Sequence, residues 1–305
     1  MSHAHDHGTS PVNYNKRFGL GIVLNLMLVV AQVIYGFQSN SVALLSDAFH
    51  NAGDVLGLVI AWGGFHIASL RPSDRFTYGL KNTTIIAAFL NAVLLFIAVG
   101  GIAWEALMRF NHPEVVQSKT VIFVAFVGMV INGITALFFL SGKHDINLRG
   151  AFLHLVSDAL VSLGVVLGSI AILYTQWYWI DPALCLGISA LIVFSSWSLC
   201  KESINLILHA VPEHIDTEKV RQFILSHETV VSVHDLHIWA ISTTETALSA
   251  HIVISAISQD NKLLKLLSDE LAHQFKIAHA TIQIEHQDEI HCGLTCDMPS
   301  RENHE

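Results

Sequence analysis

Six long apolar segments lie before residue 202, and they constrain the fold more than any other feature of the chain. Each can supply the roughly 20 helical residues that cross a hydrocarbon core of about 30 Å. Backbone groups in lipid must be hydrogen-bonded internally, so helices are the expected spanning structure. A large soluble helical core is the alternative, but only 13% of the residues are charged, against about 25% in soluble domains. The expected transmembrane helices lie near residues 17–37, 41–69, 83–109, 119–141, 148–175 and 180–201.

Basic residues between these segments predict the orientation, because cytoplasmic loops carry the excess of Lys and Arg. With the N-terminus inside, the inner connections hold eight basic residues and the outer ones hold two. The inner residues are Lys16, Arg17, Arg71, Arg75, Lys81, Lys143, Arg149 and Lys201, and the outer ones are Arg109 and Lys119. We therefore expect both termini in the cytoplasm. The short chain without organelle signals favours a bacterial inner membrane.

The composition changes near Pro212, where apolar runs give way to alternating patterns. Helices are expected at 216–227 and 261–275, and strands at 231–242, 246–255 and 277–286. The order αββαβ indicates a small ferredoxin-like domain in the cytoplasm. The predicted organisation is a His-rich tail at 1–16, the transmembrane domain at 17–208, a cytoplasmic metal-binding domain at 209–290 and a Cys-containing tail at 291–305.

Two of the apolar segments carry the same motif, His-x-x-x-Asp. The second segment has His50 and Asp54, and the fifth has His154 and Asp158. Residues i and i+4 of a helix lie on one face, so each helix presents an imidazole and a carboxylate together. A carboxylate at mid-membrane costs on the order of 2.5–3.5 kcal/mol, which a bound dication would offset. Two nitrogens and two oxygens suit tetrahedral Zn²⁺, with Asp47 as a supporting residue.

Other functions remain possible at this point. The four polar residues could pack helices without any ligand. A membrane metalloenzyme is disfavoured because the chain contains no His-Glu-x-x-His motif, the pattern that pairs zinc ligands with a general base. A membrane-bound metal sensor that does not transport would leave the four intramembrane residues without a role. The formal net charge of −9 gives no support to nucleic-acid binding.

Further metal ligands are expected outside the membrane, because the chain has 19 His residues and His is the commonest metal ligand. His234 is expected to point with Leu236 and Ile238, on a core-like face. The cytoplasmic candidates are His234, His251, His279, Glu285, His286, Asp288, Cys292 and Cys296, and the N-terminal ones are His3, His5 and His7. The alternatives are an ordinary cysteine pair and an inert polar N-terminus.

The whole chain resembles the cation diffusion facilitator family. The similarity rests on the paired His-x-x-x-Asp motifs, on Ser41–Leu45 leading into Ser46-Asp47-Ala48, on Arg71-Pro72-Ser73 with Thr77-Tyr78-Gly79, and on His234-Asp235-Leu236-His237-Ile238-Trp239. Leu80-Lys81-Asn82 departs from the family pattern. The connection Ser141–Arg149 is short and carries only His144 where many relatives have a His-rich loop.

The resemblance implies a homodimeric metal/proton antiporter that works by alternating access, with His50, Asp54, His154 and Asp158 as the transport site. It implies Zn²⁺ in preference to Cd²⁺, because the first position is His. It also implies a structural or regulatory zinc in the cytoplasmic domain. The expected function is therefore efflux of a divalent metal cation, Zn²⁺, coupled to proton entry.

Overall fold

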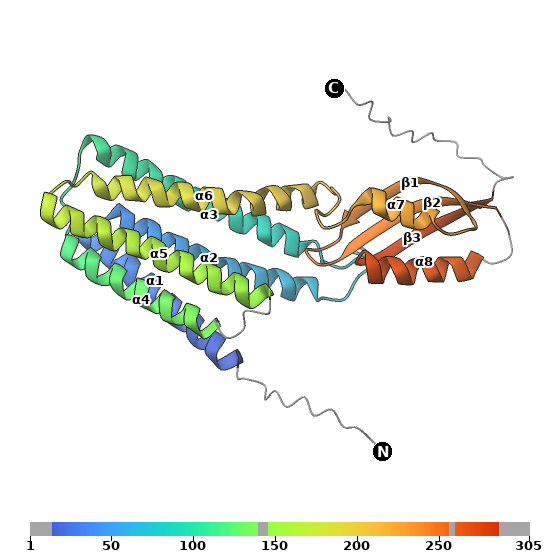
Figure 1. Cartoon of the computed structure of the whole chain (residues 1–305), viewed down its shortest axis with the longest axis horizontal. Coiled ribbons are helices and arrows are strands. Elements are labelled where there is room, and N and C mark those ends of the chain that lie inside the picture. Colours follow the sequence, from blue (N-terminus) through green and yellow to red (C-terminus); the bar gives the residue numbers. More distant parts are fainter. Residues whose placement is uncertain (1–13, 140–145, 256–259, 287–305) are drawn as a thin grey trace, which may run out of the picture. The chain divides into compact units, whose positions relative to one another are not determined.

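The structure is a computed structural model that describes residues 14–139, 146–255 and 260–286 (Figure 1). Six long helices occupy the positions predicted from the apolar segments, within three residues at each end except that α6 ends six residues later than predicted. They are α1 (Tyr14–Ser39), α2 (Val42–Ala68), α3 (Thr83–Asn111), α4 (Ser118–Phe139), α5 (Ile146–Thr175) and α6 (Ile180–Ile207).

Length and apolar composition suit several of these helices to a membrane. Among the described residues, four stretches are long and apolar enough to cross one: Thr83–Asn111, Ser118–Leu137, Phe152–Thr175 and Ile180–Ile207. Val23–Ser39 is a shorter apolar helix. Large side chains such as Phe123 and Phe194 stay 69% and 82% exposed, which suits helices that are solvated by lipid rather than water.

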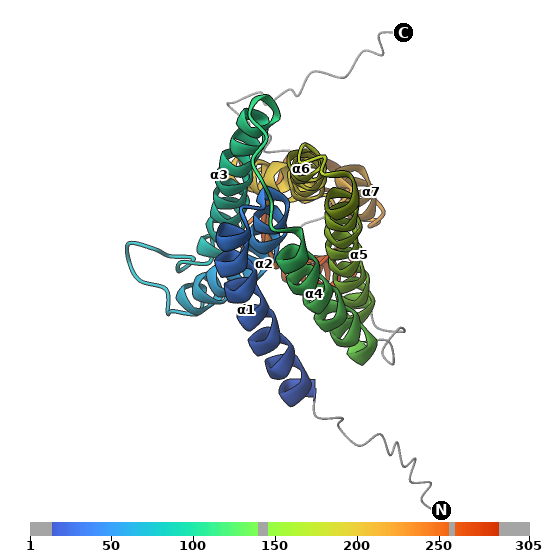
Figure 2. The same cartoon turned by 90° about the vertical axis from the view of Figure 1, so that its left-hand side faces the viewer.

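The chain forms two compact units, which are described separately. The first unit comprises residues 1–60 and 90–198, and the second comprises 61–89 and 199–305. Within the first unit, α4 packs closely against α5 and α1 packs against α4 (Figure 2). Buried Val121, Ala125 and Val165 belong to the apolar core of this unit.

The second unit contains a three-stranded sheet with the order β1-β2-β3. Its elements are α7 (Thr217–Leu225), β1 (Val230–Ala240), β2 (Thr246–Ile254), α8 (Asp260–Gln274) and β3 (Ile277–His286). The predicted αββαβ order is confirmed. β1 pairs with β2 in antiparallel register, and β2 pairs with β3 in parallel register.

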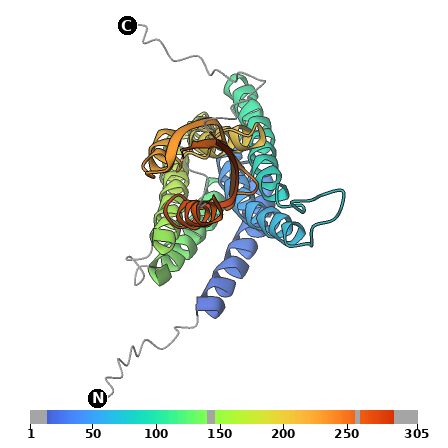
Figure 3. The same cartoon turned by 90° about the vertical axis from the view of Figure 1, so that its right-hand side faces the viewer.

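Alternation along β2 gives the sheet two different faces. Leu248, Ala250 and Ile252 belong to the apolar core that also includes buried residues of α7 and α8, and Figure 3 shows α8 along the sheet. Ser249 and His251 alternate with these residues and point to the opposite face. The helix-covered face holds the domain together, and the other face is available for polar chemistry.

The connection between α2 and α3 contacts the β1–β2 connection within the second unit. Lys81 forms an ion pair with Glu245, and the Thr243 N–H donates to Thr84 Oγ1 at 3.1 Å. The Tyr78 and His279 rings meet edge to face, with centroids 5.8 Å apart. Lys81, where the sequence departs from the family pattern, thus takes part in a contact with the α/β domain.

Two adjacent glycines of α2 differ in their surroundings and give a test of this packing. A Cβ on Gly64 would lie 2.9 Å from Ala87 Cβ and 3.2 Å from the Thr83 carbonyl, whereas a Cβ on Gly63 would meet nothing within 4 Å. Alanine is favoured over glycine in helices by about 1 kcal/mol. We expect Gly63→Ala to raise the apparent melting temperature of the purified protein in detergent and Gly64→Ala to lower it. Equal shifts for the two variants would contradict the close approach of α2 and α3.

Candidate metal centres

Helices α2 and α5 bring the two His-x-x-x-Asp motifs together in the first unit. His50 Nε2 lies 3.3 Å from Asp158 Oδ1, and His154 Nε2 lies 3.2 Å from Asp54 Oδ2. The pairing is crosswise because the first motif residue on one helix faces the last on the other. This is the geometry that antiparallel helices give to two copies of one i, i+4 motif. His154 Nε2 is also 3.6 Å from Asp158 Oδ2, so Asp158 connects the two histidines.

These distances fit a small tetrahedral cation. Zn²⁺ bonds to nitrogen and oxygen are about 2.0–2.2 Å, which places neighbouring ligands of a tetrahedron roughly 3.3–3.6 Å apart. One ligand atom from each of His50, Asp54 and Asp158 lies within 4.8 Å of the others, and His154 is not part of this group, although it contacts both carboxylates. His50 Nδ1 is buried without a hydrogen-bond partner, and the 3.3 Å contact of buried Asp158 Oδ1 with His50 Nε2 does not meet normal hydrogen-bond geometry. Buried polar atoms are normally satisfied, so the donor set is incomplete without a ligand.

Exposure changes along the site from one end to the other. The Asp54 and His154 side chains are 37% and 47% exposed, while those of His50 and Asp158 are 15% and 4% exposed. Asp54 is one helical turn farther than His50 from the start of α2. The end of the site nearer the C-terminus of α2 is therefore the accessible one.

A buried polar layer supports the closed end of the site. The Gln32 Nε2 of α1 donates to Asp47 Oδ2 at 2.6 Å, and the Ser162 hydroxyl of α5 donates to the same oxygen at 3.0 Å. Asn51 Nδ2 donates to Gln32 Oε1 at 3.2 Å. Asp47 thus holds α1, α2 and α5 together beside His50. Gln32 and Ser162 were not predicted from the sequence, although a glutamine inside an apolar helix is a usable signal.

A second polar cluster lies on the sheet of the second unit. His251 Nδ1 is 2.9 Å from Glu285 Oε1, and His234 Nε2 is 3.4 Å from Glu285 Oε2. His251 Nε2 also lies 3.7 Å from an oxygen of Asp235. His234 Nε2 and Glu285 Oε2 are buried and lack hydrogen-bond partners that meet normal geometry. Two imidazoles and a carboxylate with such atoms fit a resident Zn²⁺, with Asp235 beside them.

A bulge in β1 creates this cluster and corrects the expectation for His234. The register shifts between His234 and His237, and Asp235 has a positive φ of 49°. An extra residue in one strand changes the face to which the preceding side chains point. His234 therefore pairs with His251, while Leu236 and Ile238 lie in the apolar core. The prediction that His234 points with Leu236 and Ile238 was wrong because strict alternation cannot anticipate the bulge.

The other sequence-predicted residues lie elsewhere. His279 is exposed and pairs with Ala247 in the sheet register, six residues before Glu285, or about 20 Å along the strand. His286 follows Glu285 directly, so alternation turns it toward the opposite face. His3, His5, His7, Asp288, Cys292 and Cys296 lie outside the described residues.

The fold and the two clusters define a class of protein, a membrane cation transporter. It has several apolar helices around a His/Asp site, followed by a small α/β domain with a His/Glu cluster. A family model for the cation efflux transmembrane domain matches residues 20–208. A second model, for the cytoplasmic domain of cation efflux proteins, matches residues 212–287. The chain belongs to the cation efflux family, which is the cation diffusion facilitator family that the sequence resembles. The predicted transmembrane domain with a cytoplasmic α/β domain is confirmed, as is the prediction that the protein is not an enzyme.

Named relatives align along almost their full length. A cadmium, cobalt and zinc/H⁺-K⁺ antiporter of Bacillus velezensis is 33% identical over 315 residues, 100% of both chains. The metal cation efflux system protein CzcD of Cupriavidus metallidurans is 36% identical, over 93% of this chain and 89% of the relative. The zinc transporter ZitB of Escherichia coli is 32% identical, over 94% and 93%.

The solved metal-bound C-terminal domain of the Cupriavidus CzcD transporter is also similar in sequence. It is 38% identical and covers 23% of this chain and 99% of that domain, with a TM-score of 0.22.

The sheet cluster predicts which cytoplasmic residue controls metal binding there. Glu285→Gln removes the carboxylate that contacts both histidines, so we expect zinc affinity at this site to fall by at least about tenfold. His279→Gln on the same strand is the matched control and should leave affinity unchanged. Zinc titration of the full-length protein, with the intramembrane residues intact, measures both. Equal loss in the two variants would place the site elsewhere on β3.

Proposed function

We propose that this protein exports Zn²⁺ from the cytoplasm in exchange for protons, with His50, Asp54, His154 and Asp158 as the transport site. The crosswise pairing of two imidazoles with two carboxylates carries the proposal, because each pair has the spacing of neighbouring zinc ligands. His50, Asp54 and Asp158 also lie mutually close, and His154 joins them through Asp54. Carboxylates are retained at membrane depth only where a partner compensates their desolvation. The names of the antiporter and zinc-transporter relatives support the same cargo.

Exchange for protons follows from the chemistry of the ligands. Imidazole and carboxylate bind a metal only when they are deprotonated, so protons and Zn²⁺ exclude one another at one site. Protons that enter from the outer side would protonate His50 and His154 and release the ion. Return of the protonated site to the cytoplasmic side would then complete the exchange cycle.

The exposure gradient supports an inward-facing conformation. α6 leads into the cytoplasmic domain, so its first residues lie at the outer end, and α2 runs in the same sense through the alternating helices. The exposed pair, Asp54 and His154, is therefore on the cytoplasmic side, and the buried pair is on the outer side. This arrangement corresponds to an inward-facing state in which cytoplasmic Zn²⁺ reaches Asp54 and His154 first.

The cytoplasmic domain supplies a resident zinc site and a dimer contact in this proposal. His234, His251 and Glu285 would hold the ion, with Asp235 as a further oxygen. The family model for this domain is a dimer domain, which supports a homodimer. Bound zinc would bias the equilibrium between inward- and outward-facing states through the dimer. The distribution of basic residues favours both termini in the cytoplasm, and the bacterial source of the relatives supports a bacterial inner membrane.

Removal of one intramembrane carboxylate tests the transport site. We expect Asp54→Ala to abolish zinc flux into proteoliposomes, because His154 loses its carboxylate partner and the ion loses one ligand. Asp269→Ala, an exposed carboxylate on α8, is the control and should transport normally. Zinc flux by Asp54→Ala at the wild-type rate would refute the assignment.

A pH gradient tests the exchange with protons. In inside-out vesicles the lumen corresponds to the outer side, so an acidic lumen should drive zinc uptake by protonating the ligands there. We expect a protonophore to slow uptake several-fold, measured with a zinc-sensitive dye. Uptake that is indifferent to the gradient would favour zinc binding or passive passage over antiport.

A further inference from the structure

Buried polar groups continue from the transport site toward the outer end of the first unit. Ser46 lies one helical turn before His50 on α2, on the same face. Asp181, Cys185 and Ser189 recur at four-residue spacing and share one face of α6. All four are buried, with exposures of 1%, 1%, 0% and 4% for Ser46, Asp181, Cys185 and Ser189. The proposed cycle requires a path for the ion toward this outer end, but the ligands of the transport site do not extend there.

Two hydroxyls in this row have a thiol as their partner. Ser46 Oγ and Ser189 Oγ are buried without a hydrogen bond of normal geometry, and both interact with the Cys185 thiol. The Cys185 sulfur is also 3.9 Å from the Ile102 carbonyl of α3. A thiol is a weak donor and a weak acceptor, so it satisfies a buried hydroxyl poorly. These serines are therefore suited to exchange the thiol for an ion or water in another state.

Asp181 closes the outer end of the row. Its carboxylate accepts hydrogen bonds from the Ser41 hydroxyl and from the backbone N–H groups of Val42 and Ala43, at 2.7 and 3.3 Å. The carboxylate at the start of α6 thus satisfies the otherwise unpaired N–H groups at the start of α2. Arg109 of α3 donates to the Asn40 carbonyl at 2.8 Å, in the turn that precedes α2.

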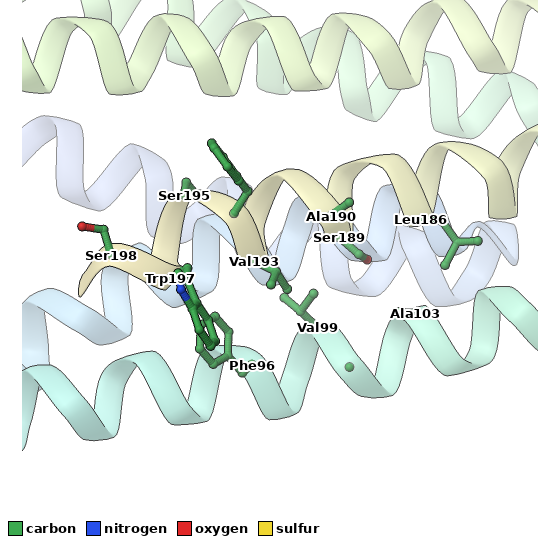
Figure 4. Close-up of a pocket in the computed structure, with 12 residues that line it drawn as sticks. Phe96, Val99, Ala103, Leu186, Ser189, Ala190, Val193, Ser195, Trp197 and Ser198 are labelled. Carbon is green, nitrogen blue, oxygen red and sulfur yellow. The ribbon is translucent and has the colours of Figure 1, made fainter. Parts of the chain in front are cut away.

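The polar row and a neighbouring groove differ in the ligands that they offer to an ion. Ser189 also lines an apolar groove between α3 and α6 (Figure 4). The side chains of that groove are mostly aliphatic or aromatic, so they provide few ligand atoms for an ion. The polar row, in contrast, provides oxygen and sulfur atoms.

We infer that the ion released by His50 and Asp158 leaves between α2 and α6, along the row formed by Ser46, Cys185 and Ser189. In the inward-facing state, the hydrogen bonds from Asp181 to the start of α2 close this route. The inference rests on the proposed function, because it supplies the outer half of the same path. The two serines are positioning residues for the passing ion and are not ligands of the resting site.

Thiol accessibility tests the route directly. Right-side-out vesicles that contain the wild-type chain are treated from outside with a membrane-impermeant thiol reagent, and the modified cysteine is located by mass spectrometry. We expect Cys185 to react several-fold faster during zinc efflux than without zinc. Asp181→Asn should raise the rate without zinc, because the carboxylate no longer holds α2. The matched control is Ala125→Cys on α4, equally buried at 0% and seven residues from its helix start, which should not react.

Serine replacement provides a second readout. Ser46→Ala with Ser189→Ala should lower maximal zinc flux several-fold while leaving the zinc affinity of the transport site and the melting temperature undiminished. A merely structural role predicts no change in flux. Ser203→Ala on α6, whose hydroxyl already donates to the Leu199 carbonyl at 2.8 Å, is the control and should transport normally.

The outcomes separate this route from the function on which it rests. Absence of zinc flux in the wild-type protein would overturn the proposed function. Normal flux with a Cys185 that never reacts, or with Ala125→Cys reacting equally, would overturn the route alone. Unchanged flux in the double serine variant would likewise overturn the role of the hydroxyls.

Discussion

The transmembrane domain depends on the pairing of two carboxylates with two imidazoles at a depth where neither carboxylate is stable alone. His50 with Asp158, and His154 with Asp54, share the cost of burial between α2 and α5. The pairing leaves His50 Nδ1 without a hydrogen bond and Asp158 Oδ1 with a contact of poor hydrogen-bond geometry, so protein groups alone do not complete the site. In the proposed function, a dication would complete these contacts.

In the proposed cycle, the surrounding polar groups would divide the path of the ion into an open and a closed half. Asp47, held by Gln32 and Ser162, forms a buried layer on the outer side of His50. Ser46, Cys185 and Ser189 follow, and Asp181 ends the row at the first turn of α2. Alternating access requires one half to open as the other closes. A few hydrogen bonds at a helix start are weak enough to exchange within such a cycle.

Sequence periodicity predicted most of the elements because the apolar runs and alternating strands are long and strongly patterned. It also indicated His50, Asp54, His154 and Asp158 as one site, because i, i+4 spacing is a local property of a helix. The cytoplasmic cluster was predicted less well. His279 shares a strand face with Glu285 but lies about 20 Å away along the strand. His234 reaches His251 only because Asp235 adopts a positive φ in a bulge.

The sequence by itself determined which residues lie in lipid, which faces of the helices are polar, and which donor types are offered to a metal. These follow from hydropathy and from backbone periodicity, both of which act within one segment. Only the tertiary structure decided that the motifs pair crosswise, that the Asp54–His154 end of the site is exposed, and that Asp181 caps a helix 139 residues earlier in the chain. Such contacts depend on helix packing and strand register, which local spacing does not specify.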